Sequence, residues 1–277
     1  MIKVRAYAKI NLALEVMDEQ NGYHKVNNIM VPISVFDELT FEKAKKDEVI
    51  VYGGYIKDNI VEKTLKMFKE KYCIPNCVSI HVTKRIPLAS GLAGGSSDAA
   101  ATILGLKELF AIGASIEELE EFGAQLGSDV PFFIESKAAL CTGRGEKVAK
   151  FDFEVPSFDL LIVKTQAGLS TKEVYKKYKY KNEPKAERIN NIIDALKEGD
   201  TSKLQNNIFN DLEEVSLSMS KELNELYTLL KNNGYKPFVS GSGPSMFIIN
   251  PSVEDIKKIR GLLPENTYLA LCHTKQL

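Results

Sequence analysis

The segment Pro87–Ala101 reads "PLASGLAGGSSDAAA" and contains three glycines followed directly by two serines. The residues before it, "CVSIHVTKRIP", alternate in polarity and are rich in valine and isoleucine, which predicts a strand that ends at Pro87. After the glycines, apolar residues recur at helical spacing, which predicts a helix that begins near Ser97 or Asp98. The segment is therefore expected to be a glycine-rich loop between a strand and a helix.

Such a loop suits the binding of phosphate. Glycine allows the backbone to approach a ligand closely and to adopt positive φ. The start of a helix offers unpaired N–H groups and a partial positive charge, which both favour anions. The spacing fits neither G-x-x-x-x-G-K-[ST] nor G-x-G-x-x-G. A simpler alternative is that Ser96, Ser97 and Asp98 only cap the helix. We favour a phosphate-binding loop of a different type.

The N-terminal segment "VRAYAKINLALEV" has an apolar residue at every even position from Val4 to Val16. This period of two predicts a strand whose even side chains face the core. Lys9 and Asn11 would then project from the opposite face, about 7 Å apart. The alternative is that this opposite face is simply the solvent-exposed side of an antiparallel sheet.

The next segment, "NGYHKV", predicts a turn at Asn21 and Gly22. The turn would place Tyr23 and His24 at the head of the following strand. A tyrosine and a histidine in such a place are more often packing residues than ligands. The pattern alone leaves both possibilities open.

A candidate acid or base stands in "GASIEELEEFGAQLGSDVPFF". Ser115 and Glu118 match a capping box, so a helix is expected to begin there. Asp129 follows the end of that helix and precedes Pro131, which prevents the helix from continuing. A carboxylate between a helix end and an apolar run is a candidate functional group. The alternative is a turn aspartate that accepts hydrogen bonds from nearby amides.

Composition narrows the class of protein. The chain has 277 residues and a net charge of −1, which gives no general attraction to nucleic acid or to anionic membranes. No apolar run approaches the roughly 18 residues of a membrane span, and charges interrupt the N-terminal segment, so no secretory signal is expected. Scattered cysteines indicate neither a zinc site nor a disulfide framework. We expect a reduced, soluble, cytoplasmic protein without an obligate protein partner.

The length favours two domains. A break is expected near residues 151–159, where Pro156 separates two apolar runs, which gives domains 1–155 and 156–277. In the second half, "KPFVSGSGPSMFII" places Gly241 and Gly243 between two short apolar strands. These glycines form either a plain hairpin turn or a second loop that approaches a ligand from the other domain.

Four segments together resemble the superfamily of galactokinase, homoserine kinase, mevalonate kinase and phosphomevalonate kinase, the GHMP kinases. They are "AKINLALEV", "PLASGLAGGSSDAAA", "LGSDVPFF" and "VSGSGPSMF", and they span nearly the whole chain. With "GYHKV", "GRGEKV" and "STKEVY", the chain resembles the branch that phosphorylates 4-diphosphocytidyl-2-C-methyl-D-erythritol, an intermediate of the non-mevalonate route to isoprenoid precursors.

The resemblance implies an α+β fold of two domains with the active site between them. The N-terminal domain would be similar to domain 2 of ribosomal protein S5, and the C-terminal domain would be ferredoxin-like. The implied reaction transfers a phosphoryl group from ATP to the 2-hydroxyl of the small-molecule substrate. The resemblance also implies Mg²⁺, but no carboxylate marks itself as a ligand, and Ser97 is only one candidate.

The resemblance assigns roles to residues of this chain. Asp129 would be the base, and Lys9 would steady Asp129 and the charge that develops during transfer. Asn11 would hold the methylerythritol part, while Tyr23, His24 and Tyr175 would bind the cytosine. The ATP phosphates would be wrapped by Pro87, Leu88, Ala89, Ser90, Gly91, Leu92, Ala93, Gly94, Gly95, Ser96 and Ser97. For the lysines that follow Tyr175, a solvated helix end is favoured over contact with the diphosphate: Lys176, Lys177, Lys179 and Lys181.

Two alternatives compete with this interpretation. In the first, the fold is kept and the substrate is homoserine, mevalonate or a sugar. The "GYH" segment argues against it, because such substrates have no base to stack on a tyrosine. In the second, the protein binds a nucleotide without catalysis. A non-catalytic relative would be expected to lose Lys9 or Asp129, and this chain has both.

Overall fold

The computed structural model describes residues 1–20, 22–53, 59–166 and 168–275. The predicted turn residue Asn21 lies outside the described residues. The elements follow in the order β1 (Ile2–Gln20), β2 (Tyr23–Ala44), β3 (Glu48–Tyr52), α1 (Ile60–Lys71), β4 (Cys77–Thr83), α2 (Gly94–Leu109), α3 (Ile116–Ala124), α4 (Val130–Glu135), β5 (Ala139–Thr142), β6 (Lys147–Lys150), β7 (Asp159–Lys164), α5 (Thr171–Lys177), α6 (Ala186–Glu198), α7 (Thr201–Asn207), β8 (Phe209–Asn210), α8 (Glu213–Met219), α9 (Lys221–Asn232), β9 (Phe238–Val239), β10 (Ser245–Ile249), α10 (Val253–Leu262) and β11 (Tyr268–His273).

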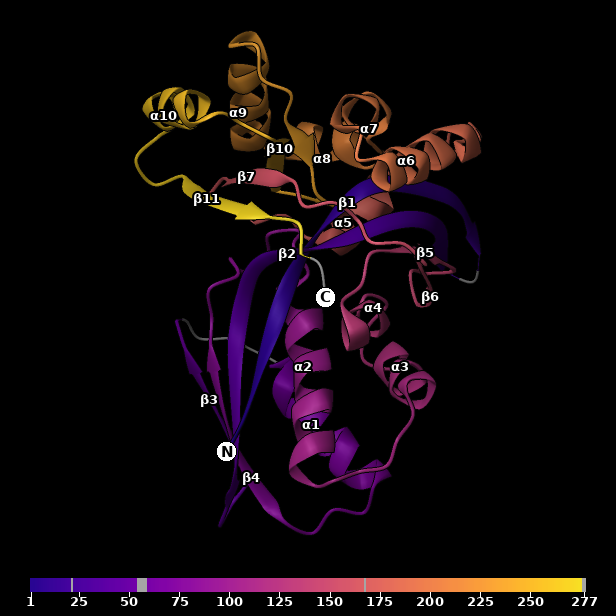
Figure 1. Cartoon of the computed structure of the whole chain (residues 1–277), viewed down its shortest axis with the longest axis vertical. Coiled ribbons are helices and arrows are strands. Elements are labelled where there is room, and N and C mark those ends of the chain that lie inside the picture. The colour runs from indigo at the N-terminus through magenta and orange to yellow at the C-terminus, as the bar shows by residue number, and fades with distance from the viewer. Residues whose placement is uncertain (21, 54–58, 167, 276–277) are drawn as a thin grey trace.

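The first sheet has the strand order β3-β4-β2-β1-β8, and the β5–β6 hairpin is attached to β2. The long strands β1 and β2 pair antiparallel, and they run from the lower part of the molecule up to the second half of the chain (Figure 1). β8 belongs to the second half of the sequence, yet it pairs parallel to β1 through Phe209 and Asn210. The first sheet is therefore built from both halves of the chain.

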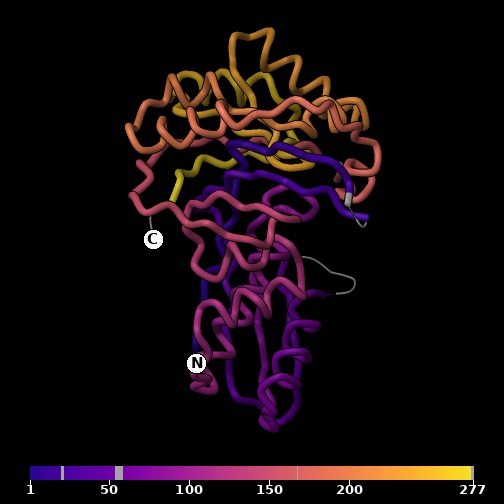
Figure 2. The backbone as a smooth tube through the Cα atoms, turned by 90° about the vertical axis from the view of Figure 1, so that its right-hand side faces the viewer, coloured from indigo at the N-terminus to yellow at the C-terminus, as the bar shows by residue number. Residues whose placement is uncertain are grey.

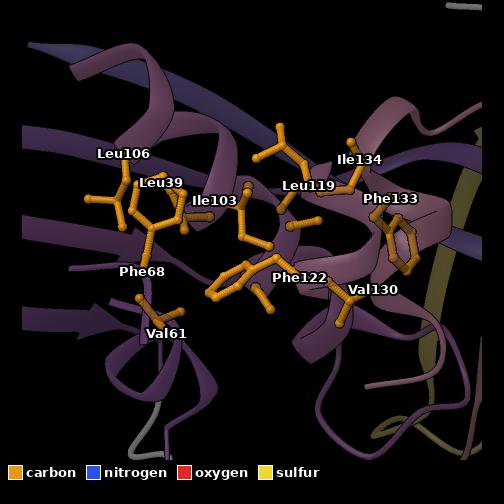
Figure 3. Packing of buried hydrophobic residues seen from close by; sticks show 14 of the residues in the cluster. Leu39, Val61, Phe68, Ile103, Leu106, Leu119, Phe122, Val130, Phe133 and Ile134 are labelled. Carbon is orange, nitrogen blue, oxygen red and sulfur yellow. The ribbon is translucent and has the colours of Figure 1, made fainter. Parts of the chain in front are cut away.

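Helix α2 is the centre of the lower core. Its apolar side chains meet those of the sheet and of helices α1, α3 and α4 in one cluster (Figure 3). Gly105 brings α2 close to the sheet, because a Cβ at this position would lie 2.2 Å from the ring of Phe41. Phe41 is fully buried, and truncation of such a residue to alanine typically costs about 3–5 kcal/mol. This packing fixes the position of the N-terminus of α2.

Strand β1 confirms the period-two prediction with one refinement. Its pairing with β2 shifts register after Tyr7 and again after Asn11, so its apolar residues serve three different cores. Ala6 joins the lower core, Ile10 joins the core beneath the second sheet, and Leu14 joins a third cluster with α5. Register shifts of this kind bend a strand and re-aim its side chains.

The second sheet has the antiparallel order β11-β7-β10-β9. One face packs against α9 and α10 through an apolar cluster that includes Leu161, Leu226 and Ile259. This strand order, with α9 directly before β9 and α10 between β10 and β11, is the ferredoxin-like arrangement that the resemblance implied. The other face shares a core with β1, β2 and α6, so the upper and lower layers of Figure 2 are joined by packed side chains.

The helices of the described part are short. None of them is both long and apolar enough to cross a lipid bilayer.

Candidate functional site

A cavity of about 1000 Å³ lies where the two halves of the chain meet. This volume is at the upper end of the roughly 300–1,000 Å³ that is usual for ligand sites. Strands β1 and β2, the glycine-rich loop, the β5–β6 hairpin, helix α5 and the β9–β10 turn all contribute to its lining. The predicted residues that line it are Lys9, Asn11, Tyr23, His24, Pro87, Leu88, Ala89, Ser90, Gly91, Ala93, Gly94, Gly95, Ser96, Asp129 and Tyr175. Two other predicted residues, Leu92 and Ser97, are buried beneath the loop.

Lys9 is buried, with 4% of its surface exposed. Its Nζ donates hydrogen bonds to Oδ1 of Asn11 at 2.7 Å and to the carbonyl of Gly91 at 2.9 Å. Asn11 is itself fixed, because its Nδ2 donates to Oδ1 of Asn28 at 2.7 Å. Burial lowers the pKa of Lys9 below its ordinary value, and the charge of Asp129 opposes this in part. The two residues predicted to share a face of β1 are therefore in direct contact, and that face is not solvent-exposed.

Asp129 precedes α4 and lines the same cavity. It occupies the N-cap position of α4, but its side chain accepts no capping hydrogen bond. Pro131 lies in the first turn of α4, where its missing N–H costs nothing. Gly145 of the β5–β6 hairpin covers the carboxylate, since a Cβ there would lie 3.7 Å from Oδ1 of Asp129. This geometry disfavours the simple turn aspartate and leaves the carboxylate able to accept a proton from a ligand.

The glycine-rich loop differs from its prediction in one respect. Helix α2 begins at Gly94, not near Ser97 or Asp98, so the two glycines belong to its first turn. The prediction was wrong because Ser97 and Asp98 point into the protein, where both are buried, and do not cap the helix. The N-cap is Ala93, in the left-handed conformation with φ 57°.

Unpaired amides result from this geometry. The first backbone bond of α2 runs from the N–H of Ser97 to the carbonyl of Ala93 at 3.0 Å. The amides of Gly94, Gly95 and Ser96 precede that bond, and all three residues line the cavity. Among the described residues, the nearest atom to a Cβ on Gly95 would be Cγ2 of Ile60, at 4.0 Å, which leaves this backbone accessible to a ligand on the described side. A helix N-terminus of this kind attracts phosphate groups.

The second glycine turn is both a hairpin and a wall of the cavity. It joins the paired strands β9 and β10, and Gly241 and Ser242 line the cavity. Ser240 donates hydrogen bonds to Oδ1 of Asn11 and to the carbonyl of Gly91, each at 3.2 Å. Gly91 has φ 78°, and a Cβ on it would lie 2.3 Å from the carbonyl oxygen of Ser240. The two glycine segments therefore need this close approach to place Lys9 between them.

The far end of the cavity is aromatic. The ring of His24 lies 6.0 Å from that of Tyr175 and 5.9 Å from that of Tyr178, measured between centroids. Nδ1 of His24 lies 2.8 Å from the carbonyl of Met17. Because a carbonyl only accepts, Nδ1 carries a hydrogen, and in that tautomer of the imidazole Nε2 is the acceptor. Tyr23 is 58% exposed at the same end of the cavity. Burial raises the pKa of Tyr175, so its phenol stays protonated.

Three cationic residues of the cavity were missed as site residues: Lys84, Arg144 and Lys172. Arg144 lies in "GRGEKV" and Lys172 in "STKEVY", two of the segments that carried the family resemblance, which was the available signal. Nothing in the local pattern around Lys84 indicates its two partners. Its Nζ bonds to Asp37 and, at 2.6 Å, to Asp98.

Sequence comparisons identify the family of this chain. The profile of the GHMP kinases N terminal domain matches residues 59–137, and that of the GHMP kinases C terminal domain matches residues 192–266. A 4-diphosphocytidyl-2-C-methyl-D-erythritol kinase of Thermoanaerobacter pseudethanolicus is 39% identical over 93% of this chain and 90% of its own length. One of the same name from Clostridioides difficile is 37% identical over 92% of this chain and 88% of its own.

Solved structures give the same result. A 4-(cytidine 5'-diphospho)-2C-methyl-D-erythritol kinase superposes with a TM-score of 0.79 at 25% identity, over 99% of this chain and 100% of that one. A homoserine kinase of Cytophaga hutchinsonii has a TM-score of 0.74 at 19% identity, over 99% and 94% of the two chains, and shares the fold. The chain therefore belongs to the GHMP kinases, in the family of the 4-diphosphocytidyl-2-C-methyl-D-erythritol kinases.

Proposed function

We propose that this enzyme transfers the γ-phosphoryl group of ATP to the 2-hydroxyl of 4-diphosphocytidyl-2-C-methyl-D-erythritol. One observation carries the proposal: a single cavity joins an amide-rich loop, a lysine–carboxylate pair and an aromatic end with a histidine. A kinase for this substrate needs these parts in this order, because its nucleobase and its reacting hydroxyl stand at opposite ends of a diphosphate.

Phosphoryl transfer depends mainly on positioning and on electrostatic stabilisation. The free amides at the start of α2 would hold the phosphates of ATP, as would the neighbouring residues of the segment 87–97. Asp129 would accept the proton of the attacking hydroxyl. Lys9, buried and bonded to neutral oxygens, would stabilise the negative charge that develops on transfer. Asn11 would orient the methylerythritol part beside Lys9.

We propose Mg²⁺ as the metal, because it prefers oxygen ligands and commonly binds through one or two carboxylates together with substrate phosphates. The oxygens of Ser96, Ser128 and Asp129 line the cavity and suit such a metal. The buried hydroxyl of Ser97 has no hydrogen-bond partner in the described part of the chain, but it does not line the cavity. We therefore favour Asp129 over Ser97 as the protein ligand. When bound, the metal would neutralise charge on the phosphates of ATP.

The aromatic end would bind cytosine. Tyr23 and Tyr175 would offer ring faces, and stacking is worth about 1–3 kcal/mol per base, with little discrimination between bases. Discrimination would come from His24. Its Nε2 accepts hydrogen bonds, since Nδ1 donates to Met17. Cytosine presents an exocyclic amine, which donates, whereas uracil presents a carbonyl at that position. The tautomer therefore favours cytosine.

The same end of the cavity separates the two alternatives. The shared fold of the homoserine kinase does not distinguish substrates, because one fold supports many functions. Homoserine, mevalonate or a sugar has no nucleobase, so it would leave Tyr23, His24 and Tyr175 without a base to bind. A non-catalytic binding role is disfavoured because Lys9 and Asp129 are both present and both line the cavity.

The finer organisation is also proposed. We divide the chain into units 1–155 and 156–277, which the connection between β6 and β7 supports. We place the enzyme in the cytoplasm, acting on small molecules without an obligate protein partner. The free thiols of Cys73, Cys77, Cys141 and Cys272 fit a reducing compartment.

The test is ADP release with Mg²⁺ and ATP across a panel of acceptors. We expect turnover with 4-diphosphocytidyl-2-C-methyl-D-erythritol, slower turnover with its uridyl analogue, and almost none with homoserine, mevalonate or galactose. Efficient phosphorylation of one of these last three would contradict the proposal. Equal use of the cytidyl and uridyl compounds would contradict the role of His24.

A further inference from the structure

The cavity contains more positive charge than the catalytic pair requires. Five cationic side chains line it: Lys9, Lys84, Arg144, Lys172 and Lys176. Lys9 is fixed between Asn11 and Gly91, and Lys84 is neutralised by two carboxylates. The other three are exposed, and of them only Arg144 has a carboxylate within ion-pair distance among the described residues, that of Glu146 at 3.9 Å from its Nε.

Arg144 lies on the wall formed by the β5–β6 hairpin. Its guanidinium carbon is 5.2 Å from the centroid of the Tyr23 ring, at the nucleobase end. The next residue, Gly145, covers the carboxylate of Asp129, because a Cβ atom added to Gly145 would lie 3.7 Å from Oδ1 of Asp129. Arg144 therefore lies between the residue proposed to stack on the base and the residue proposed to deprotonate the hydroxyl.

The hairpin also presents Arg144 in a fixed direction. The carbonyl of Gly143 accepts a hydrogen bond from the amide of Val26 at 2.8 Å, which ties the hairpin to β2. The amide of Arg144 donates to Glu146 at 2.6 Å. The Nε of Arg144 is 3.9 Å from the same carboxylate. In the described part of the chain its Nη groups donate to no protein acceptor, so they can bind an anion.

Lys172 lines the same cavity from helix α5. The preceding residue, Thr171, shares a hydrogen bond of 2.9 Å with Ser242 in the second glycine turn, on the side of Lys9. Three residues further on, Tyr175 lies at the base end beside His24. Lys172 is therefore between the catalytic pair and the base, whereas Lys176 lies beyond Tyr175. No ion pair of Lys172 occurs among the described residues.

We propose that Arg144 and Lys172 together bind the diphosphate of the nucleotide substrate in this cavity. The proposal rests on the proposed function, because the diphosphate of that substrate joins its base to its reacting part. Arginine can offer a phosphate two parallel N–H donors, and lysine supplies a compact charge. The sequence analysis favoured a solvated helix end for the lysines after Tyr175, and this proposal assigns the diphosphate contact to a lysine before it. Lys181 is paired with Glu214 instead.

Binding of cytidine and of CDP, measured by calorimetry with saturating ADP in the ATP site, isolates the diphosphate. The wild-type protein should bind CDP more tightly than cytidine. Arg144→Gln and Lys172→Met should each weaken CDP by about tenfold and leave cytidine nearly unchanged, since a charged hydrogen bond is worth about that much. Lys147→Met on the same hairpin and Lys177→Met on the same helix are the matched controls, and neither should change CDP binding.

Kinetics complete the test. Each variant should raise the KM of the cytidyl substrate and leave the KM of ATP unchanged. An equal loss of cytidine and CDP would overturn the proposal by assigning both residues to the base. A raised KM for ATP would overturn it by assigning them to the ATP phosphates. If the wild-type enzyme failed to phosphorylate the cytidyl substrate, the proposed function would fall, while the CDP result would still decide the anion site.

Discussion

Lys9 and Lys84 are both buried lysines that line one cavity, but their partners differ in charge. Lys84 contacts the carboxylates of Asp37 and Asp98. Burial alone would lower the pKa of Lys84, but the charges of Asp98 and Asp37 outweigh it and raise that pKa. Lys9 contacts two neutral oxygens, and burial lowers its pKa. The same residue type is thus stabilised as a cation in one place and destabilised in the other.

The difference separates a structural lysine from one suited to catalysis. The charge of Lys84 is neutralised within the protein by Asp37 and Asp98. Asp37 also accepts a hydrogen bond from the amide of Ile86 at 2.8 Å, which anchors the start of the glycine-rich loop. The charge of Lys9 is not cancelled by a carboxylate in contact. It is therefore available to an incoming phosphoryl group, which would favour the charged form of Lys9.

The largest expected effect is that of Asp129→Asn. It removes the proposed base while nearly preserving shape, and general-base catalysis is typically worth about 10²–10⁴-fold. We expect kcat to fall in that range, with the cytidyl substrate still bound and the melting temperature unchanged. The charge of Asp129 raises the pKa of Lys9, so that pKa should fall further in the variant. Near-normal turnover of the variant would show that Asp129 is not the base and has only a structural role.

The next largest effect should separate the two lysines. Lys84→Met leaves Asp37 and Asp98 buried without their cation, which typically costs about 3–5 kcal/mol in the free energy of unfolding. Lys9→Met removes two hydrogen bonds but also the burial of a charge, and it leaves no carboxylate buried without its cation, so it should cost less than Lys84→Met. Lys9→Met should nevertheless abolish most turnover. Urea unfolding and ADP release measure the two quantities, and equal stability losses would break the comparison.

The smallest effect concerns pH. Burial, the neighbouring charge of Asp37 and the opposing charge of Lys84 together raise the pKa of Asp98 from 3.8 to about 7. Between these values the folded state binds a proton that the unfolded state does not. The contribution of Asp98 is therefore fully present below pH 4 and is lost as pH rises towards 7.

Asp98→Asn should remove that slope, so its unfolding free energy should change less between pH 5 and pH 8 than that of the wild type. Exposed Asp152 supplies the control, because Asp152→Asn should keep the wild-type slope. A variant at Asp98 with an unchanged slope would show that this carboxyl is ionised throughout the range.

The strand Val4–Val16 shows how far local pattern reaches. The period of two placed Lys9 and Asn11 on one face, and the structure has them in contact at 2.7 Å. The pattern left open whether that face is exposed, because burial depends on what packs against it. Here the glycine segments around Gly91 and Ser240 cover that face. Gly91 lies 82 residues from its partner Lys9, and Ser240 lies 229 residues from its partner Asn11.

The loop shows where local pattern misleads. Apolar residues recur at helical spacing from Ala100 onward, so the helix was expected to begin near Ser97 or Asp98. The side chain of Asp98 instead points inward, where Nζ of Lys84 donates a hydrogen bond to it, and the helix begins at Gly94. The packing of Ile86 also requires a glycine there, because a Cβ on Gly94 would lie 2.9 Å from its Cγ2.

The sequence by itself determined the local order of strand, glycine loop and helix, the face shared by Lys9 and Asn11, and the family resemblance. These follow from side-chain periodicity and from the backbone freedom of glycine, which act over a few residues. Only the tertiary structure decided which lysine is neutralised by carboxylates, which amides at the start of α2 face the cavity, and that Arg144 and Lys172 line the same cavity. Ion pairing, burial and cavity shape depend on residues far apart in the chain, and no local pattern encodes their meeting.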